Sequence, residues 1–255
     1  YGDGMYGGNG GDDVLDGGTG NDYLVGGLGS DTYLFGRGDG QDSIYNVGDA
    51  YSSTADPTPN KVDRLLFREG IATSDVQLTR SGDSLIIKIV GSTDQVTVQS
   101  YFTGDGVSTQ GYAVDRIAFA DGTSWDVSTV KALTLSAATA AADNLIGYAT
   151  NDSIAGLGGN DILSGRGGAD TIDGGDGADL VYGEAGDDTL AGGNDSDTLY
   201  GGAGADALQG GAGNDNLYGD DGNDTIDGGV GTDYLVGGTC ADVYLFGAGN
   251  GVDTV

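Results

Sequence analysis

Residues 201–219 read GGAGADALQGGAGNDNLYG, which is one nine-residue pattern written twice. Each copy has glycine at its first, second and fourth positions, aspartate at the sixth and leucine at the eighth, as Asp206 and Leu208 illustrate. Glycine lets the backbone adopt positive φ in a tight turn, and the last three residues suffice for a short strand with one inward aliphatic side chain. We therefore predict that each copy forms one turn followed by one strand.

The same pattern fills most of the chain. From Asp143 onward an aspartate recurs every nine residues without a slip, at Asp152, Asp161, Asp170, Asp179, Asp188, Asp197, Asp206, Asp215, Asp224, Asp233 and Asp242. A shorter run in the same frame holds Asp13, Asp22 and Asp31, and a two-residue slip then leads to Asp42. These are two blocks of one internal repeat.

One turn and one short strand make half of a flattened coil. If two nonapeptides form a coil, residues 18 apart stack on neighbouring coils about 4.8 Å apart. Alternate aspartates then line two edges of the coil, where stacked carboxylates repel each other. Calcium binds oxygen ligands at about 2.3–2.6 Å, and the turns offer carbonyl oxygens beside the carboxylates. Burial of one aliphatic side chain per nine residues does not compensate for the conformational entropy that those residues lose on folding. We therefore expect the blocks to fold only with calcium.

Composition excludes several other classes of site. The chain has 255 residues, 53 of them glycine, and a net charge of −31 with no histidine and one cysteine. This charge argues against nucleic acid or an anionic membrane as a partner, since both attract basic proteins. Zinc or copper ligand sets, a Ser-His-Asp triad, a Cys-His pair and a disulfide are also excluded. Hard cations with oxygen ligands remain, and repeat-like text at both ends suggests a piece of a longer protein.

Residues 47–135 have a different pattern. Apolar and polar residues alternate there, as in DVQLTRSGDSLIIKIV, and seven of the nine basic residues lie in this part. We therefore expect an all-β chain with three domains: a short β-roll block over 1–46, an antiparallel β domain over 47–135 and a long β-roll block over 136–255. Asp63 and Asp83 are interpreted as solvated charges at strand ends, and Tyr101 and Trp125 as core residues.

The nonapeptides over about 1–46 and 140–255 resemble the RTX family of secreted bacterial proteins. This resemblance implies a right-handed parallel β-roll with two repeats per coil and several bound calcium ions. It implies aspartate ligands at Asp13, Asp22, Asp31, Asp152, Asp161, Asp170, Asp179, Asp188, Asp197, Asp206, Asp215, Asp224, Asp233 and Asp242. It further implies carbonyl ligands at Gly159, Gly168, Gly177, Gly186, Gly204, Gly213, Gly222 and Gly231. We expect about seven to nine ions in the long block and about one to three in the short one.

Two further features qualify this resemblance. The middle segment, from KVDRLLFREGI to YAVDRIAFADGTSW, resembles the haemolysin-type calcium-binding-related domain, which implies no chemistry by itself. Position four of the turn, normally glycine, is Thr150, Asp195 or Cys240 in three repeats. Aspartate tolerates left-handed backbone geometry better than threonine or cysteine does. We expect the turn at Asp195 to persist and the sites at Thr150 and Cys240 to be weakened.

The resemblance also predicts a function. It implies a calcium-binding module of a bacterial protein exported by type I secretion, such as a toxin, which folds on extracellular calcium. The alternatives are a structural repeat of a surface-layer protein or adhesin, with cell-surface or matrix partners, and the non-catalytic tail of a secreted protease or lipase. Ice binding is disfavoured because no regular threonine ladder lines the variable positions. We expect no catalytic activity and no membrane insertion, and calcium ions and neighbouring domains as partners.

Overall fold

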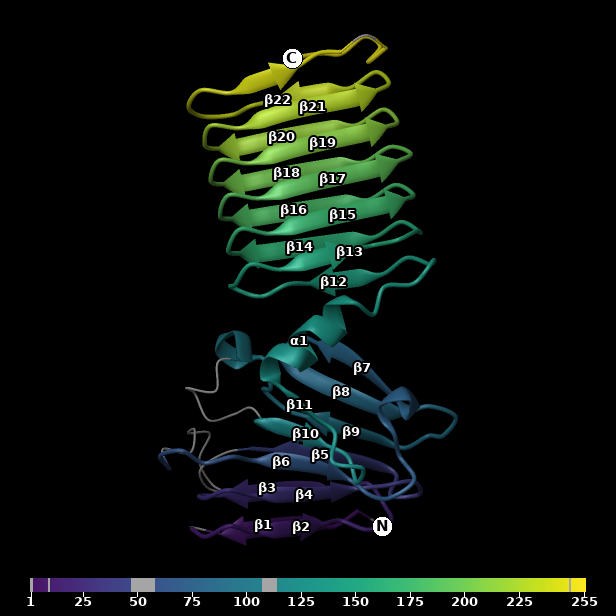
Figure 1. The fold of residues 1–255 in the computed structure, drawn as a ribbon, viewed down its shortest axis with the longest axis vertical. Coiled ribbons are helices and arrows are strands. Elements are labelled where there is room, and N and C mark those ends of the chain that lie inside the picture. Colours follow the sequence, from purple (N-terminus) through teal and green to yellow (C-terminus); the bar gives the residue numbers. More distant parts are fainter. Residues whose placement is uncertain (1, 9, 47–57, 107–113, 248) are drawn as a thin grey trace. The chain divides into compact units, whose positions relative to one another are not determined.

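Short strands joined by tight turns make up most of the chain in the computed structural model (Figure 1). The structure describes residues 2–8, 10–46, 58–106, 114–247 and 249–255. The chain forms two compact units, Tyr1–Thr134 and Leu135–Val255. The predicted division into three domains stays a prediction from the sequence pattern, and the two units are described separately below.

The second unit is a parallel β-solenoid of stacked coils with two six-stranded sheets. One sheet contains β12 (Asn144–Ile146), β14 (Ile162–Gly167), β16 (Leu180–Ala185), β18 (Thr198–Ala203), β20 (Asn216–Asp221) and β22 (Tyr234–Val236). The other contains β13 (Ser153–Ala155), β15 (Thr171–Asp176), β17 (Thr189–Asn194), β19 (Ala207–Ala212), β21 (Thr225–Val230) and β23 (Val243–Leu245). Leu163 lies opposite Val181, and Val181 opposite Leu199. The predicted coil of two nonapeptides is therefore confirmed.

The interior strands of this unit are six residues long, which is twice the predicted length. They continue through the first three positions of the following repeat, so Arg166 pairs with Glu184 and Gly167 with Ala185. Arg166 and Glu184 stand at position two of their turns and both have a φ of 75°. The backbone therefore takes left-handed geometry inside the hydrogen-bonded ladder rather than beyond it.

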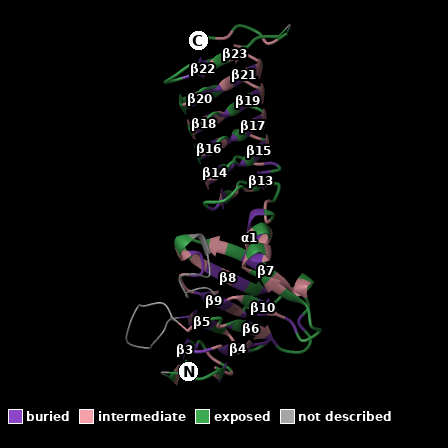
Figure 2. Cartoon of the chain, turned by 60° about the vertical axis from the view of Figure 1, so that its left-hand side comes forward, coloured by how far each residue is buried: buried purple, intermediate pink, exposed green. Residues whose placement is uncertain are grey.

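The core of the second unit is a single file of eighth-position side chains from each sheet. Leu163, Val181, Leu199 and Leu217 are fully buried in one sheet, and the flanking strand positions alternate outward (Figure 2). On the outer face, Tyr182, Tyr200 and Tyr218 stack with ring centroids 5.2 and 4.9 Å apart and planes 9° from parallel. The file of aliphatic side chains and the tyrosine stack both follow from the register, because parallel pairing places equivalent repeat positions over one another.

The first unit also has two sheets. A six-stranded sheet has the order β1 (Gly4–Gly8), β3 (Tyr23–Gly27), β5 (Gln41–Tyr45), β9 (Gln95–Val98), β8 (Ser84–Ile89) and β7 (Val76–Ser81). A five-stranded sheet has the order β11 (Ser124–Asp126), β10 (Arg116–Ala118), β6 (Arg64–Phe67), β4 (Thr32–Phe35) and β2 (Val14–Asp16). The strands of the short block therefore share both sheets with strands of the middle segment.

The middle segment is antiparallel only in part. The pairs β7 with β8, β8 with β9, and β10 with β11 are antiparallel, as the alternating pattern predicted. In contrast, β9 pairs in parallel with β5, β6 with β4, and β10 with β6. These three strands continue the parallel stacking of the short block. The alternating pattern could not predict this, because alternation specifies which face of a strand is buried and not the direction of the strand.

The first unit has a conventional core and short helices. Phe67 lies 6.2 Å from Phe35 and 5.2 Å from Phe119 between ring centroids, and Trp125 packs edge-on against Phe119. Tyr101 is buried, as predicted. The helices that begin among its described residues are η1 (Thr73–Asp75), η2 (Thr103–Gly106) and α1 (Val127–Leu135), none of which the sequence analysis expected.

The start of α1 is set by Asp126. Its Oδ1 accepts a 2.8 Å hydrogen bond from the backbone N–H of Thr129, and the hydroxyls of Ser128 and Thr129 also donate to it. These bonds lower the pKa of Asp126 to about 2. The helical sequence VSTVKALTL contains several β-branched residues, so the cap and its position after a strand outweigh weak helix propensity.

Candidate metal centre

The sixth-position aspartates form a hydrogen-bonded column along each edge of the second unit. The backbone N–H of Asp188 donates to Oδ1 of Asp206, 18 residues later, at 2.8 Å. The same bond, 2.7–3.1 Å long, recurs from Asp143 to Asp161, Asp152 to Asp170, Asp161 to Asp179, Asp170 to Asp188, Asp179 to Asp197, Asp197 to Asp215, Asp206 to Asp224, Asp215 to Asp233 and Asp224 to Asp242. We call each such column of aspartates, here and in the first unit, an aspartate ladder.

The second carboxylate oxygen of these aspartates has a different environment. Among the described residues, Oδ2 is buried and accepts no hydrogen bond in Asp13, Asp22, Asp31, Asp42, Asp161, Asp170, Asp179, Asp188, Asp197, Asp206, Asp215, Asp224 and Asp233. A buried carboxylate oxygen without a partner is costly, because it has lost its hydration. A row of such oxygens along each edge is the environment that a bound cation would satisfy.

The first-position glycine makes room for this oxygen. A Cβ atom on Gly201 would lie 2.5 Å from Oδ2 of Asp206 and 2.8 Å from the carbonyl oxygen of Gly219, one coil further on. A Cβ atom on Gly174 would meet Oδ2 of Asp179 and the carbonyl oxygen of Gly192 at 2.4 and 2.5 Å. The bare glycine Cα therefore lets a carboxylate oxygen and a main-chain carbonyl approach it closely, which a Cβ atom would prevent.

The fourth-position glycines carry the carbonyls that the resemblance implied as ligands. Gly204 and Gly222 have φ of 151° and 157°, and a Cβ atom on Gly222 would lie 1.4 Å from the carbonyl oxygen of Gly204. The carbonyl oxygens of Gly159, Gly168, Gly186 and Gly213 meet the glycine 18 residues later in the same way. Each of these carbonyls therefore faces the next coil, on the same edge as the aspartates.

Electrostatics reinforce the need for a cation. Burial raises the pKa of Asp197 from 3.8 to about 7, against the opposing effect of the N–H of Asp179, and the charges of Asp215 and Asp179 raise it further. Burial also raises the pKa to about 6 in Asp31, Asp42, Asp170, Asp179, Asp206 and Asp215. The folded edges therefore disfavour negative charge unless positive charge compensates it.

The ladder extends to aspartates that the sequence analysis did not name as ligands. The N–H of Asp22 donates to Oδ1 of Asp42 at 2.9 Å, and that of Asp233 to Oδ1 of Asp253 at 3.2 Å. On the other edge of the first unit the ladder runs from Asp13 to Asp31, then to Asp63 and Asp115, with bonds of 3.0, 2.8 and 2.7 Å.

The interpretation of Asp63 as a solvated charge was wrong, since Asp63 is only 1% exposed. It lies directly before β6 and accepts the bond from Asp31 as if it belonged to a nonapeptide. The signal was the repeated phrase VDRLLF at 62–67 and VDRIAF at 114–119, in which an aspartate precedes a strand as it does in the repeats.

Two of the three irregular turns keep a left-handed residue at position four. Asp195 and Cys240 adopt the left-handed φ of 73° and 82°, whereas Thr150 does not. Asp152 and Asp242, at the two ends of one edge, are more exposed than the interior ladder members. The turn at Asp195 persists, as predicted, and the ladder is least enclosed at its ends.

The candidate sites are not clusters of acidic side chains. Over the part of the chain that the structure describes, no group of three or more His, Cys, Asp and Glu side chains is placed to hold one metal ion. Each candidate site instead joins carboxylates from the ladder with main-chain carbonyls, which is an oxygen-only donor set suited to calcium.

Among the described residues, none of the helices has both the length and the apolar character that a membrane span requires.

Comparison with known proteins agrees with this geometry. The model of the haemolysin-type calcium binding protein related domain matches residues 85–129. The chain is 47% identical over 116 residues to the iron-regulated protein FrpA of Neisseria meningitidis serogroup C, a match that spans 46% of this chain and 9% of the relative. The RTX calcium-binding nonapeptide repeat model matches more than half of the chain, at residues 7–44, 138–172, 164–199, 200–235 and 218–253. The chain therefore belongs to the family of RTX calcium-binding nonapeptide repeat proteins.

Proposed function

We propose that this chain is a module that folds on binding calcium and thereby stabilises a larger, secreted bacterial protein. The observation that carries the proposal is the row of buried Oδ2 atoms without hydrogen-bond partners, from Asp161 to Asp233. The folded edges hold these carboxylates one above another at the coil spacing. Without compensating charge, this arrangement destabilises the folded state relative to a solvated chain.

The residues that would hold calcium are those predicted from the repeat. The ladder aspartates would contribute Oδ2, and the turn glycines, such as Gly204 and Gly213, would contribute carbonyl oxygens. Bound calcium supplies positive charge between neighbouring coils. The chain itself positions the ligands, because each carboxylate is fixed by the ladder bond at Oδ1 while Oδ2 stays available.

The energetics of the repeats support the proposed location and role in export. One buried aliphatic side chain per nonapeptide leaves the second unit dependent on its edges for stability. Calcium affinities of about 10⁻⁴–10⁻³ M, typical of extracellular modules, would keep the repeats unfolded in the low-calcium cytosol and folded outside the cell. An unfolded chain can be threaded through an export channel, which fits type I secretion.

The role in the parent protein is inferred from the length of the relative. The match to FrpA spans only 9% of that protein, which supports a module within a much longer chain. We propose that the module has no catalytic site, since its family is one of calcium-binding repeats. The parent would then be a toxin, a surface-layer protein or adhesin, or a secreted protease or lipase, and the module would have the same role in each.

A calcium titration of the chain tests this proposal. Circular dichroism should show loss of most strand signal in a chelator and a cooperative gain on adding calcium, with a midpoint in the range of about 10⁻⁴–10⁻³ M. Titration calorimetry should count several ions per chain, and magnesium serves as the control cation. A full strand spectrum in the chelator would refute calcium-dependent folding, and a midpoint below about 10⁻⁶ M would refute the export role.

A further inference from the structure

The aspartate ladder of the first unit continues beyond the nonapeptides, to a member with an unusual partner. Oδ1 of Asp63 accepts the N–H of Asp31 at 2.8 Å, in the same way as the ladder bonds within the repeats. Asp63 is buried and lies directly before β6, which pairs in parallel with β4. In position and burial, Asp63 is therefore equivalent to the sixth residue of a nonapeptide.

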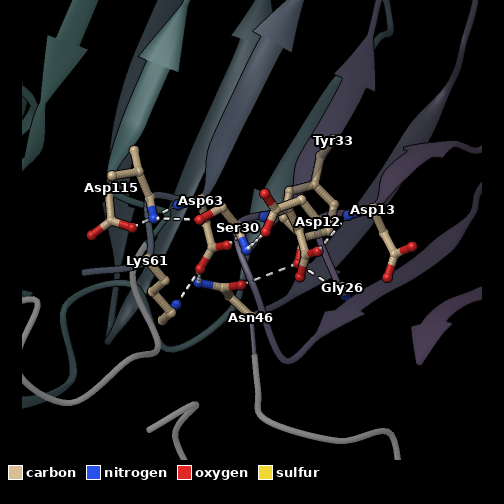
Figure 3. Close-up of polar contacts among 11 residues, drawn as sticks. Asp12, Asp13, Gly26, Ser30, Tyr33, Asn46, Lys61, Asp63 and Asp115 are labelled. Carbon is tan, nitrogen blue, oxygen red and sulfur yellow. Dashed lines mark hydrogen bonds and ion pairs between the residues drawn. The ribbon is translucent and has the colours of Figure 1, made fainter. Parts of the chain in front are cut away.

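The difference lies at Oδ2. In Asp13 and Asp31, on the same edge, this oxygen is buried without a hydrogen-bond partner. In Asp63, the ammonium group of Lys61 and the side-chain amide of Asn46, at 2.8 Å, both donate to it (Figure 3). The Lys61 side chain is only 8% exposed. A buried ammonium group thus contacts the carboxylate oxygen whose counterparts in Asp13 and Asp31 have no hydrogen-bond partner.

A second set of contacts joins this ion pair to the neighbouring turn. The hydroxyl of Tyr33 donates to Oδ1 of Asn46 at 3.1 Å and accepts the N–H of Gly26 at 3.0 Å. Gly26 is the first-position glycine of the turn that contains Asp31, and a Cβ atom there would lie 2.1 Å from Oδ2 of Asp31. A chain of buried hydrogen bonds therefore runs from the turn of the last nonapeptide to the Lys61–Asp63 pair.

The strands beside this pair belong to the conventional core of the first unit. Leu65 and Phe67 of β6 are fully buried, and Phe67 packs between Phe35 of β4 and Phe119. Aromatic burial on this scale stabilises a fold without metal ions, in contrast to the single file of aliphatic residues in the nonapeptides. The ladder member that contacts Lys61 is therefore Asp63, which lies next to strands of an ordinary hydrophobic core.

We propose that the Lys61 ammonium takes the place of calcium at this level of the ladder, so that β4 and β6 stay paired at calcium concentrations at which the nonapeptide coils open. The inference rests on the proposed calcium-dependent folding and assigns one level of the ladder to an internal cation. The first unit would then keep a calcium-independent coil that contains β4 and β6, on which its nonapeptides at Asp13 and Asp22 order when calcium binds.

Hydrogen exchange of the full chain, with and without chelator, tests this inference. Without calcium, the wild-type chain should keep protection in β4 and β6 while β14 to β21 lose it. Lys61→Met should speed exchange in β6 by about 100-fold or more in the chelator, because removing one partner leaves a buried charge unpaired. Lys88→Met, at an exposed site on β8, is the matched control and should leave β6 unchanged.

A double variant keeps the test decisive if Lys61→Met folds poorly. Lys61→Met with Asp63→Asn removes both buried charges and retains an oxygen at Asp63 for the N–H of Asp31, so it should recover most of the protection of β6. A double variant as unprotected as Lys61→Met would overturn the inference, as would wild-type β6 that exchanges as fast as the repeats in chelator. Repeats that stay protected in chelator would instead refute the proposed function itself.

Discussion

The backbone N–H of Asp188 donates to Oδ1 of Asp206 at 2.8 Å, while Oδ2 of Asp206 is buried without a hydrogen-bond partner. One carboxylate therefore has two roles. Its first oxygen fixes the stacking of neighbouring coils, and its second lies close to Gly201, where an added Cβ atom would meet it at 2.5 Å. These roles can be separated by mutation, because an amide side chain preserves the acceptor and removes the charge.

Asp206→Asn should lower the number of calcium ions bound by about one, since the ladder bond survives but the anionic ligand is lost. Asp206→Ala should lose the ion and also leave the N–H of Asp188 unsatisfied, at a further cost of about 1–3 kcal/mol. Asp173→Asn, on the exposed face of β15, is the control. Titration calorimetry and thermal melting in saturating calcium measure both effects, and equal ion counts for Asp206→Asn and Asp173→Asn would contradict this assignment.

Gly201→Ala should weaken the same site without changing any charge. The added Cβ atom would lie 2.5 Å from Oδ2 of Asp206, so the carboxylate must move from its position, at a cost of roughly 1–3 kcal/mol. Gly158→Ala is the matched control, because a Cβ atom there makes only ordinary contacts at 3.6 Å and Gly158 has no positive φ. Calcium midpoints from circular dichroism should rise for Gly201→Ala alone; a similar rise for both variants would point to a general effect of losing glycine.

The sequence predicted the register of the second unit because the repeat never changes length. A strict period of nine residues stacks Leu163 on Val181 only if two nonapeptides form each coil. The same reasoning could not reach Asp63 and Asp115, because the ladder arrives at them by steps of 32 and 52 residues. Two stacked strands can be separated by a connecting segment of any length, so the spacing of the aspartates does not reveal these two positions. Only the local phrase VDR is common to both.

The length of the strands was underestimated for a different reason. Position two of the turn holds Arg166, Glu184 and Asp220 in β14, β16 and β20, and each takes a left-handed φ between 70° and 75°. Side chains of these types give no sequence signal for such geometry, which usually requires glycine. The strands therefore continue past the expected turn, through the second and third positions of the next repeat.

Cys240→Gly should stabilise the last complete turn of the second unit. Cys240 has a φ of 82°, where a non-glycine residue is strained by about 1–2 kcal/mol, and glycine would relieve this strain at some entropic cost in the unfolded chain. We expect a net gain of roughly 0.5–1 kcal/mol and slower hydrogen exchange around β23. Cys240→Ser is the control, because it removes the thiol and keeps the strained Cβ atom. Equal stability of the glycine and serine variants would show that the strain at this turn is negligible.

Acid should stabilise the calcium-free roll. Burial raises the pKa of Asp197 to about 7 and that of Asp179 and Asp215 to about 6, whereas an ordinary aspartate has a pKa of 3.8. Between these values the folded state binds more protons than the unfolded chain. The free energy of unfolding therefore rises as the pH falls from about 7 toward about 4, and this stability is lost as the pH rises through the raised pKa values.

Circular dichroism of calcium-free protein should accordingly show more strand at pH 5 than at pH 7.5. Lowering the pH should have the opposite effect on calcium binding, because protons compete with the ion for the same carboxylates. The calcium concentration at the folding midpoint should therefore be higher at pH 5 than at pH 7.5. Asp197→Asn mimics the protonated side chain, so calcium-free Asp197→Asn should be more stable than wild type at pH 7.5 and less sensitive to pH. A calcium-free spectrum that is the same at both pH values would mean that the buried carboxylates do not limit folding.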